Sequence, residues 1–177
     1  GYFAQEVPDM DTDQSVIDYI RDVAEYIPTR DGKISATMML ERFLFDSAMQ
    51  YAPIANLSGG EKRRLYLLKV LMEAPNVLLL DEPSNDLDIP TLTILEDYLD
   101  SFAGIVIAVS HDRYFLDNIV DRIFAFEGNG HLTQYEGGYT DYTEALARKG
   151  GAVSEGQSTA VGAEKKKSAQ ADWKQNR

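Results

Sequence analysis

Two short apolar runs, each followed directly by polar residues, constrain the fold of this chain most strongly. The runs are Val77–Leu80 and Ile105–Val109, and a segment long enough for a helix separates them. Continuous apolar strands of this kind are typical of parallel sheets that are covered on both faces. Alternation of strand and helix is typical of α/β domains. We therefore expect an α/β fold with a parallel sheet, and we expect both strands to be covered on both faces.

A helix start with two glycines precedes the first of these strands. Ser58 and Glu61 have the spacing of a capping box, in which each side chain satisfies a backbone N–H near the helix start. Gly59 and Gly60 leave the helix N-terminus bare, so its N–H groups and the positive end of the helix dipole can meet a phosphate. We interpret the adjacent Lys62-Arg63-Arg64 as the solvated face of this helix rather than as a nucleic-acid contact.

Polar side chains follow the two strands where open α/β sheets bind their ligands. Asp81 and Glu82 follow the first strand, and His111 and Asp112 follow the second. We expect Asp81 to orient the water shell of Mg²⁺ and Glu82 to polarise an attacking water as general base. His111 is expected on the same rim as Glu82, where an imidazole can hold a terminal phosphate and the attacking water. Asp112 is interpreted as the cap of the next helix.

These residues together indicate nucleotide hydrolysis, but one part of such a site is missing. A phosphate-binding loop has the form G-x-x-x-x-G-K-[ST], and Gly32-Lys33 is followed here by Ile34. The chain begins without methionine, and residues 1–5 read as the end of a strand, so we expect a fragment whose phosphate loop lies upstream. Gln5, at the end of that strand, can reach Mg²⁺ or the attacking water. The chain is thus expected to carry half of an ATPase site.

The segment after the first strand is predicted to be a small helical subdomain. Thr12 or Asp13 can cap a first helix whose apolar positions run from Val16 to Ile27, and Pro28 closes it. Ser35 is predicted to cap a second, short helix.

Four segments are expected along the chain, and the last of them is a linker. The linker is rich in Gly, Ser, Ala and Gln, has no apolar period, and contains Lys165–Lys167 and Trp173. The predicted segments are 1–5 (end of the core strand), 6–74 (helical subdomain with the glycine-rich helix), 75–149 (C-terminal part of the ATPase core) and 150–177 (linker). Within the third segment we predict helices near 91–102 and 112–119, strands near 120–126 and 131–136, and a helix over 139–148.

Composition limits the class of protein. The 177 residues are 44% hydrophobic, as in globular domains. No apolar run approaches the roughly 18 residues of a membrane helix, and no signal segment opens the chain, so we expect a cytosolic protein without a membrane domain. The absence of cysteine excludes disulfides and thiolate metal sites. A net charge of −12 argues against broad binding to duplex nucleic acid, which needs many basic groups.

The order and spacing of these motifs resemble the ATP-binding cassette superfamily. Gln5 matches the Q-loop, Leu57–Glu61 the signature, Val77–Glu82 the Walker B strand with its catalytic glutamate, Ser84–Asp88 the D-loop, and His111 the switch histidine. The resemblance implies an ABC ATPase fold of the P-loop type that lacks its N-terminal part.

Within that superfamily, three stretches look like the ABC-F branch. They are Asn56–Arg64, the Asn-Asp-Leu-Asp run that ends at Asp88, and Ser110–Asp117. The match covers roughly residues 1–147 and looks most like the second cassette of Uup-type proteins, followed by their linker. Ser84 stands where the branch commonly has threonine.

The resemblance implies two cassettes in one chain that lacks membrane domains, binds the ribosome with its tRNA and rRNA, and uses ATP to govern translation. Each nucleotide then lies between the phosphate loop of one cassette and the signature of the other. By this resemblance Ser58, Gly59, Gly60 and Glu61 contact the nucleotide of the partner cassette. The residues that serve the nucleotide of their own cassette are Gln5, Asp81, Glu82 and His111, with Gln5 and Asp81 on Mg²⁺, and Asp88 is included as a nucleotide-binding residue of the D-loop.

Two alternatives remain open from the sequence. One is the ATPase subunit of a transporter, which a coupling groove in the helical subdomain would favour but the D-loop and the histidine region do not. The other is a non-catalytic interaction module, which donates its signature to a partner and is itself inactive. Heads of the SMC type fit less well, because nothing here leads into a long heptad coiled coil.

Overall fold

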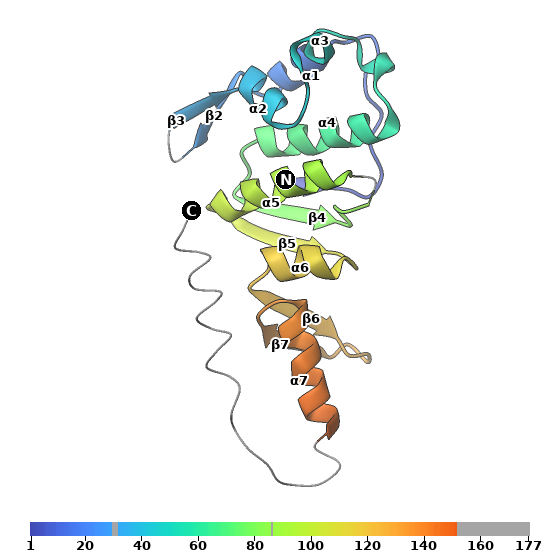
Figure 1. Cartoon of the computed structure of the whole chain (residues 1–177), viewed down its shortest axis with the longest axis vertical. Helices are drawn as coiled ribbons and strands as arrows, with labels where there is room; N and C mark the ends of the chain where they lie inside the picture. The colour runs from blue at the N-terminus through green and yellow to red at the C-terminus, as the bar shows by residue number, and fades with distance from the viewer. Residues whose placement is uncertain (30–31, 86, 152–177) are drawn as a thin grey trace. The chain divides into compact units, whose positions relative to one another are not determined.

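A three-stranded parallel sheet carries the candidate site (Figure 1). The computed structural model describes residues 1–29, 32–85 and 87–151. The strands lie in the order β1 (Tyr2–Phe3), β4 (Val77–Asp81), β5 (Ile105–Val109). In β4, Leu79 pairs with Tyr2 on one side and with Ile107 on the other. The predicted α/β fold with a parallel sheet is confirmed.

One face of this sheet is buried and the other is exposed. Leu78 and Leu80 are at most 1% exposed and join Phe3 in the core. The apolar side chains on the opposite face are between 37% and 62% exposed, and they are Val77, Leu79, Ile105, Ile107 and Val109. Successive strand residues point to opposite faces, and only one face is covered by the described residues. The prediction that both strands are covered on both faces is therefore wrong for the described chain.

The segment between β1 and β4 contains helices and a hairpin. In chain order its elements are α1 (Val16–Arg21), β2 (Tyr26–Thr29), β3 (Gly32–Ser35), α2 (Ala36–Arg42), α3 (Ser47–Gln50), the 3₁₀ helix η1 (Ile54–Asn56) and α4 (Gly59–Met72). Helix α4 packs against the sheet through β1, where the Tyr66 ring lies 5.2 Å from the Phe3 ring, centroid to centroid. Its buried Leu65 and Leu68 belong to the same core as Leu78 and Leu80.

The first helix of this segment is shorter than predicted. Helix α1 ends at Arg21, and it is capped by Ser15, whose Oγ accepts from the backbone N–H of Asp18 at 3.3 Å. The predicted caps Thr12 and Asp13 lie before this position. The predicted Ser35 cap of α2 is confirmed, because its Oγ accepts from the Met38 N–H at 3.2 Å.

A hairpin replaces the end of the predicted first helix. In β2, Ile27 is buried at 3% exposure and pairs with Ile34 of β3, and Pro28 pairs with Lys33. Ile27 therefore reaches the core from a strand rather than from a helix. A short apolar run fits either period, which explains why the sequence pattern did not separate the two.

The rest of the chain follows the predicted order of elements. Its elements are α5 (Ile89–Ser101), α6 (Arg113–Ile119), β6 (Arg122–Phe126), β7 (Leu132–Glu136) and α7 (Tyr139–Gly151). Strands β6 and β7 form a separate antiparallel hairpin. Residues 1–142 form one compact unit, and a second unit begins at Thr143. Apart from the end of α7, the predicted linker, with Lys165–Lys167 and Trp173, lies outside the described residues. None of the helices in the described ranges has the length and apolar character needed to span a bilayer.

Candidate functional site

The N-terminus of helix α4 is formed by the predicted capping box. Ser58 Oγ accepts from the Glu61 N–H at 3.3 Å, and Glu61 Oε2 accepts from the Ser58 N–H at 2.7 Å. The backbone N–H of Ser58, and next its hydroxyl, stabilise the ionised carboxylate and lower the pKa of Glu61. At Gly59 an added Cβ would meet no atom within 4 Å. The first turn of α4 is therefore held by the hydrogen bonds between Ser58 and Glu61, and it remains open to a ligand at Gly59.

Asp81 ends strand β4 and Glu82 follows it, and the two residues have different environments. Asp81 Oδ2 accepts from the Tyr2 hydroxyl at 3.2 Å, and this hydrogen bond raises the pKa of Tyr2. Glu82 has a backbone φ of 47°, in the left-handed region that side-chain-bearing residues rarely adopt. Its N–H donates to the carbonyl of Val109, at the end of β5, at 2.8 Å. The end of β4 is thus joined to the end of β5.

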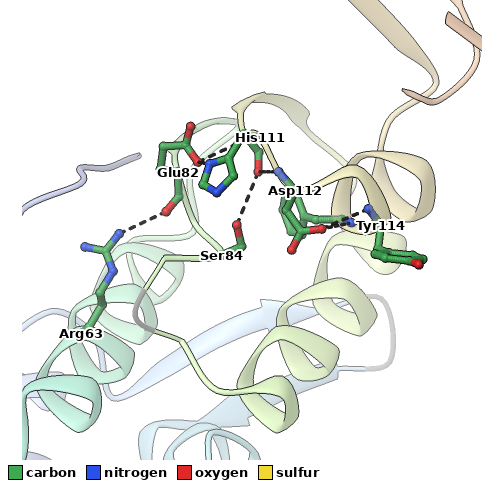
Figure 2. A network of polar contacts seen from close by, with 8 residues as sticks. Arg63, Glu82, Ser84, His111, Asp112 and Tyr114 are labelled. Atoms are coloured by element: carbon green, nitrogen blue, oxygen red, sulfur yellow. Dashed lines mark hydrogen bonds and ion pairs between the residues drawn. The ribbon is translucent and has the colours of Figure 1, made fainter. Parts of the chain in front are cut away.

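Glu82 and His111 meet across the ends of these two strands. Figure 2 shows the imidazole beside the carboxylate, with His111 Nδ1 at 2.7 Å from Glu82 Oε2. The backbone N–H of His111 also donates to Oε2, at 3.4 Å. The imidazole is 73% exposed and the carboxylate 21%. The pair therefore lies at the open rim of the sheet, where a small molecule can reach both groups.

A second short chain of polar contacts lies beside this pair (Figure 2). Ser84 Oγ lies 3.5 Å from Ser110 Oγ, and Ser110 Oγ accepts from the Asp112 N–H at 3.0 Å. Asp112 Oδ1 accepts from the N–H groups of Tyr114 and Phe115 at 3.0 and 3.2 Å, so the predicted cap of α6 is confirmed. These contacts join the loop after β4 to the loop after β5.

Asp88 caps helix α5. Its Oδ1 accepts from the Thr91 N–H at 2.9 Å, and its Oδ2 lies 3.6 Å from Arg64 Nη1. Hydrogen bonds from Thr91, with a smaller contribution from the Arg64 charge, lower the pKa of Asp88. Asp86, in the middle of the same predicted D-loop, lies outside the described residues.

The interpretation of Lys62-Arg63-Arg64 as a solvated face is wrong for both arginines. Arg63 is 2% exposed and Arg64 is 8% exposed. The Arg64 guanidinium lies over the Phe45 ring at 4.8 Å, and the Arg63 guanidinium lies over the Phe3 ring at 4.6 Å. Cations are rarely buried without such partners, so both side chains are part of the packing between α4 and its neighbours.

Arg63 is the site residue that the sequence reasoning missed. It lies four, seven and eight positions before the buried apolar residues Leu67, Val70 and Leu71. Residues at these spacings share one helix face. A basic residue on the apolar stripe was therefore a signal for a buried arginine.

Gln5 lies near the glycines of α4. It lines a hollow of about 380 Å³ together with Val7, Gly59, Gly60 and Arg63. Gln5 is itself exposed, and its backbone carbonyl accepts from Arg63 Nη1. The structure thus brings one residue from the end of β1 to the open start of α4.

The oxygen donors at this rim fit a magnesium ion only in part. No group of three acidic or histidine side chains among the described residues could hold a metal alone. Mg²⁺ commonly takes one or two carboxylates and completes its shell with water and substrate phosphates. Asp81, as a carboxylate, and Gln5, as an amide oxygen, are suitable members of such a shell.

Known proteins of similar fold and sequence define the class. A family model described as ABC transporter matches residues 2–85. A solved structure of the ATP-binding subunit of an ABC transporter matches with a TM-score of 0.62 at 17% identity, over 84% of this chain and 62% of that chain, which shows the fold. The fold is therefore that of part of an ATP-binding cassette.

Three relatives place the chain more narrowly. YfmR of Bacillus subtilis, described as an uncharacterized ABC transporter ATP-binding protein, is 58% identical over 150 residues, 84% of this chain and 24% of YfmR. The ATP-binding protein Uup of Haemophilus influenzae is 41% identical over 147 residues, 83% of this chain and 23% of Uup. The energy-dependent translational throttle protein EttA of Escherichia coli is 38% identical over 143 residues, 81% of this chain and 26% of EttA. The chain belongs to the ABC-F family and spans about a quarter of the length of these relatives.

Proposed function

We propose that this chain is the signature-bearing part of a cassette in an ABC-F ATPase that hydrolyses ATP and acts on the ribosome in translation. The observation that carries the proposal is the contact between Glu82 and His111 at the ends of neighbouring parallel strands. A general base must lie within hydrogen-bond reach of the group that it deprotonates. A carboxylate that contacts an imidazole through one oxygen at an open rim leaves its other oxygen to accept from a water molecule beside the pair.

The proposed chemistry assigns one role to each side chain. Both contacts with His111 are made by Glu82 Oε2, so Oε1 is the oxygen that accepts a proton from water. The water oxygen then forms a bond to the γ-phosphorus, and the bond from that phosphorus to the β–γ bridging oxygen breaks, with the electron pair leaving on ADP. The His111 imidazole donates to the phosphate or holds the water. Asp81 and Gln5 would hold Mg²⁺, which would supply positive charge to neutralise the phosphates.

The start of helix α4 is proposed to serve a second nucleotide. Its open first turn offers backbone N–H groups and the positive end of the helix dipole to a phosphate. Ser58, Gly59, Gly60 and Glu61 would contact the nucleotide of another cassette, and Asp88 would lie at the junction of the two cassettes. We propose that the partner is a second cassette of the same full-length protein, that the protein is cytoplasmic, and that the phosphate-binding loop of this cassette is supplied by residues outside this chain.

The ribosome, with its tRNA and rRNA, is proposed as partner from the relatives. EttA is named as a translational throttle, and this chain is similar to it over 143 residues. The transporter alternative has support from the name of the matching family model. For the isolated 177 residues, the exposed apolar face of the sheet supports the interaction-module alternative, because a covered sheet is expected of a complete cassette.

The first test compares Glu82→Gln with the unaltered protein in a full-length form that includes a phosphate-binding loop. We expect turnover to fall by roughly 10² to 10⁴-fold, the range of general-base catalysis, while ATP still binds. The measurements are single-turnover hydrolysis and equilibrium binding of labelled ATP. Normal hydrolysis by a variant altered in this way at both cassettes would contradict the proposed role of Glu82.

A second comparison sets the 177-residue chain beside a form extended upstream. We expect only the extended form to bind ATP. Hydrolysis by the short chain alone would mean that it contains a phosphate-binding element of another kind.

A further inference from the structure

The guanidinium of Arg63 joins two segments that are far apart in the sequence. Its Nε donates to the carbonyl of Asn85 at 2.9 Å, and its Nη1 donates to the carbonyls of Ala4, at 3.2 Å, and Gln5. Its Nη2 donates to the carbonyl of Glu82 at 3.4 Å, the contact drawn in Figure 2. Ala4 and Gln5 follow β1, and Glu82 and Asn85 belong to the loop that follows β4. One side chain of α4 thus holds the main chain after both strands.

The chemistry of arginine suits this position. A buried cation is costly unless its hydrogen-bonding groups are satisfied, and Arg63 is 2% exposed. The planar guanidinium presents five N–H donors in a fixed fork and stacks on aromatic rings, and Arg63 lies 4.6 Å above the centre of the Phe3 ring. The ring fixes the plane of the guanidinium, and the plane fixes the directions in which its N–H groups point.

The Glu82 carbonyl is the most consequential of these acceptors. Glu82 lies in the left-handed region with a φ of 47°, and such a conformation persists only where its surroundings determine it. Its carbonyl accepts from the Asn85 N–H at 3.2 Å as well as from Arg63, and its N–H donates to Val109. Because the backbone sets the direction of the Cα–Cβ bond, these bonds also set where the carboxylate points.

We propose that Arg63 is a positioning residue that couples the placement of helix α4 to the direction of the Glu82 carboxylate. Arg63 lies three positions after Gly60 in α4. The buried Arg63 side chain therefore links two parts of the proposed site: the start of α4, proposed to face a second nucleotide, and the Glu82 carboxylate, proposed to face the nucleotide of its own cassette. A shift of α4 on contact with a phosphate moves the guanidinium, and the guanidinium moves the Glu82 carbonyl. The inference rests on the proposed hydrolytic role of Glu82.

Arg63→Lys is the variant that tests this coupling. Lysine keeps the charge and most of the length, but its ammonium has three donors on a single nitrogen and cannot span the same carbonyls. In the full-length protein we expect kcat to fall roughly ten- to hundredfold, as for a misplaced catalytic group, while KM for ATP changes by less than about threefold. Lys62→Gln, which removes a charge from the neighbouring position of the same helix, is the matched control and should leave both constants unchanged.

A double-mutant cycle separates positioning from general damage to the fold. If Arg63 acts through Glu82, Arg63→Lys has no further effect on single-turnover hydrolysis in the Glu82→Gln background. An equal fall in both backgrounds, or a kcat that stays at the wild-type value, overturns the proposal. Should Arg63→Lys melt near the assay temperature, Arg63→Gln, which retains two amide donors, takes its place in the same cycle.

Amide hydrogen exchange gives a readout that needs no ATP. We expect the amides of Glu82, Ser84 and Asn85 to exchange faster in Arg63→Lys and at the normal rate in Lys62→Gln, because only Arg63→Lys removes a hydrogen bond to this turn. Unchanged exchange in Arg63→Lys overturns the positioning role even if the protein hydrolyses nothing. The unaltered protein could fail to hydrolyse ATP while Arg63→Lys still shows faster exchange. That result would count against the proposed function but would leave the link between Arg63 and Glu82 intact.

Discussion

A substitution at Gly59 is expected to affect the proposed nucleotide contact without affecting the stability of the fold. Its φ is not in the left-handed region, and a Cβ added to it meets no atom within 4 Å. Alanine also favours helices over glycine by about 1 kcal/mol at interior positions and by less near an end. Gly59→Ala should therefore leave the free energy of unfolding unchanged or slightly raised.

The same substitution should abolish ATP turnover in the full-length protein, because a methyl group would stand between the helix start and a phosphate. Chemical denaturation and an ATPase assay on the same preparation test both halves. Full turnover by Gly59→Ala would argue that no phosphate approaches this turn.

Asp88 makes the stability of the chain depend on pH. Asp88→Ala removes the acceptor for the Thr91 N–H, and loss of such a cap costs about 1 kcal/mol in the free energy of unfolding at pH 7. The pKa of Asp88 is lowered in the folded chain. Its contribution is therefore fully present above the pKa of an unfolded aspartate, about 4, and is lost as the pH falls through the lower folded value.

Urea denaturation at pH 7, 5 and 3.5 measures this dependence. The difference in stability between the unaltered chain and Asp88→Ala should be constant from pH 7 to 5 and should shrink towards pH 3.5. Asp88→Asn retains a capping oxygen without the carboxylate and should lose this dependence on pH. A difference that stays the same at all three pH values would speak against the carboxylate as the source.

At the level of elements, β5 is an edge strand of the parallel sheet, and the side chains on one of its faces are apolar and exposed. β5 pairs with β4 on one side, and Ile105, Ile107 and Val109 are between 54% and 62% exposed. An apolar strand at the edge of a sheet is a template for pairing with another chain. We expect the isolated 177 residues to self-associate as their concentration rises.

Ile107→Lys should reduce that association, since it places a charge in the middle of the exposed strand. Tyr51→Lys introduces the same charge at a residue that is 67% exposed outside the sheet, and it should have no such effect. Sedimentation velocity over a range of concentrations distinguishes the variants. Equal association of all three forms would mean that another surface is responsible.

The elements that the sequence predicted correctly are those with a strong local signal. The cap at Ser35 and the capping box of Ser58 and Glu61 depend on side chains that bond within three residues, and such bonds can be read from spacing alone. The hairpin of β2 and β3 was missed although Asp31-Gly32, between two short runs, is a common hairpin signal in sequence. Pairing of Ile27 with Ile34 and of Pro28 with Lys33 decided the conformation there.

At the level of the whole molecule, the site is predictable where it depends on topology. The carboxyl ends of adjacent parallel strands lie on one rim, so the meeting of Glu82 and His111 follows once both strands are recognised. The role of Arg63 does not follow in this way. It depends on carbonyls at residues 4, 5, 82 and 85, whose meeting point is set by the packing of α4 on the sheet.

The positive φ of Glu82 bears on which substitution at this position is suitable for capturing a nucleotide-bound complex. Glycine adopts a positive φ without cost, so replacing Glu82 by glycine would remove the carboxylate and relax the loop together. A valine or isoleucine would add steric conflict at the same angle. Glutamine keeps the length and shape of the side chain, and with them the forced conformation of its backbone. A complex trapped with glutamine should therefore preserve the backbone geometry described for Glu82, whereas one trapped with glycine would report on a relaxed loop.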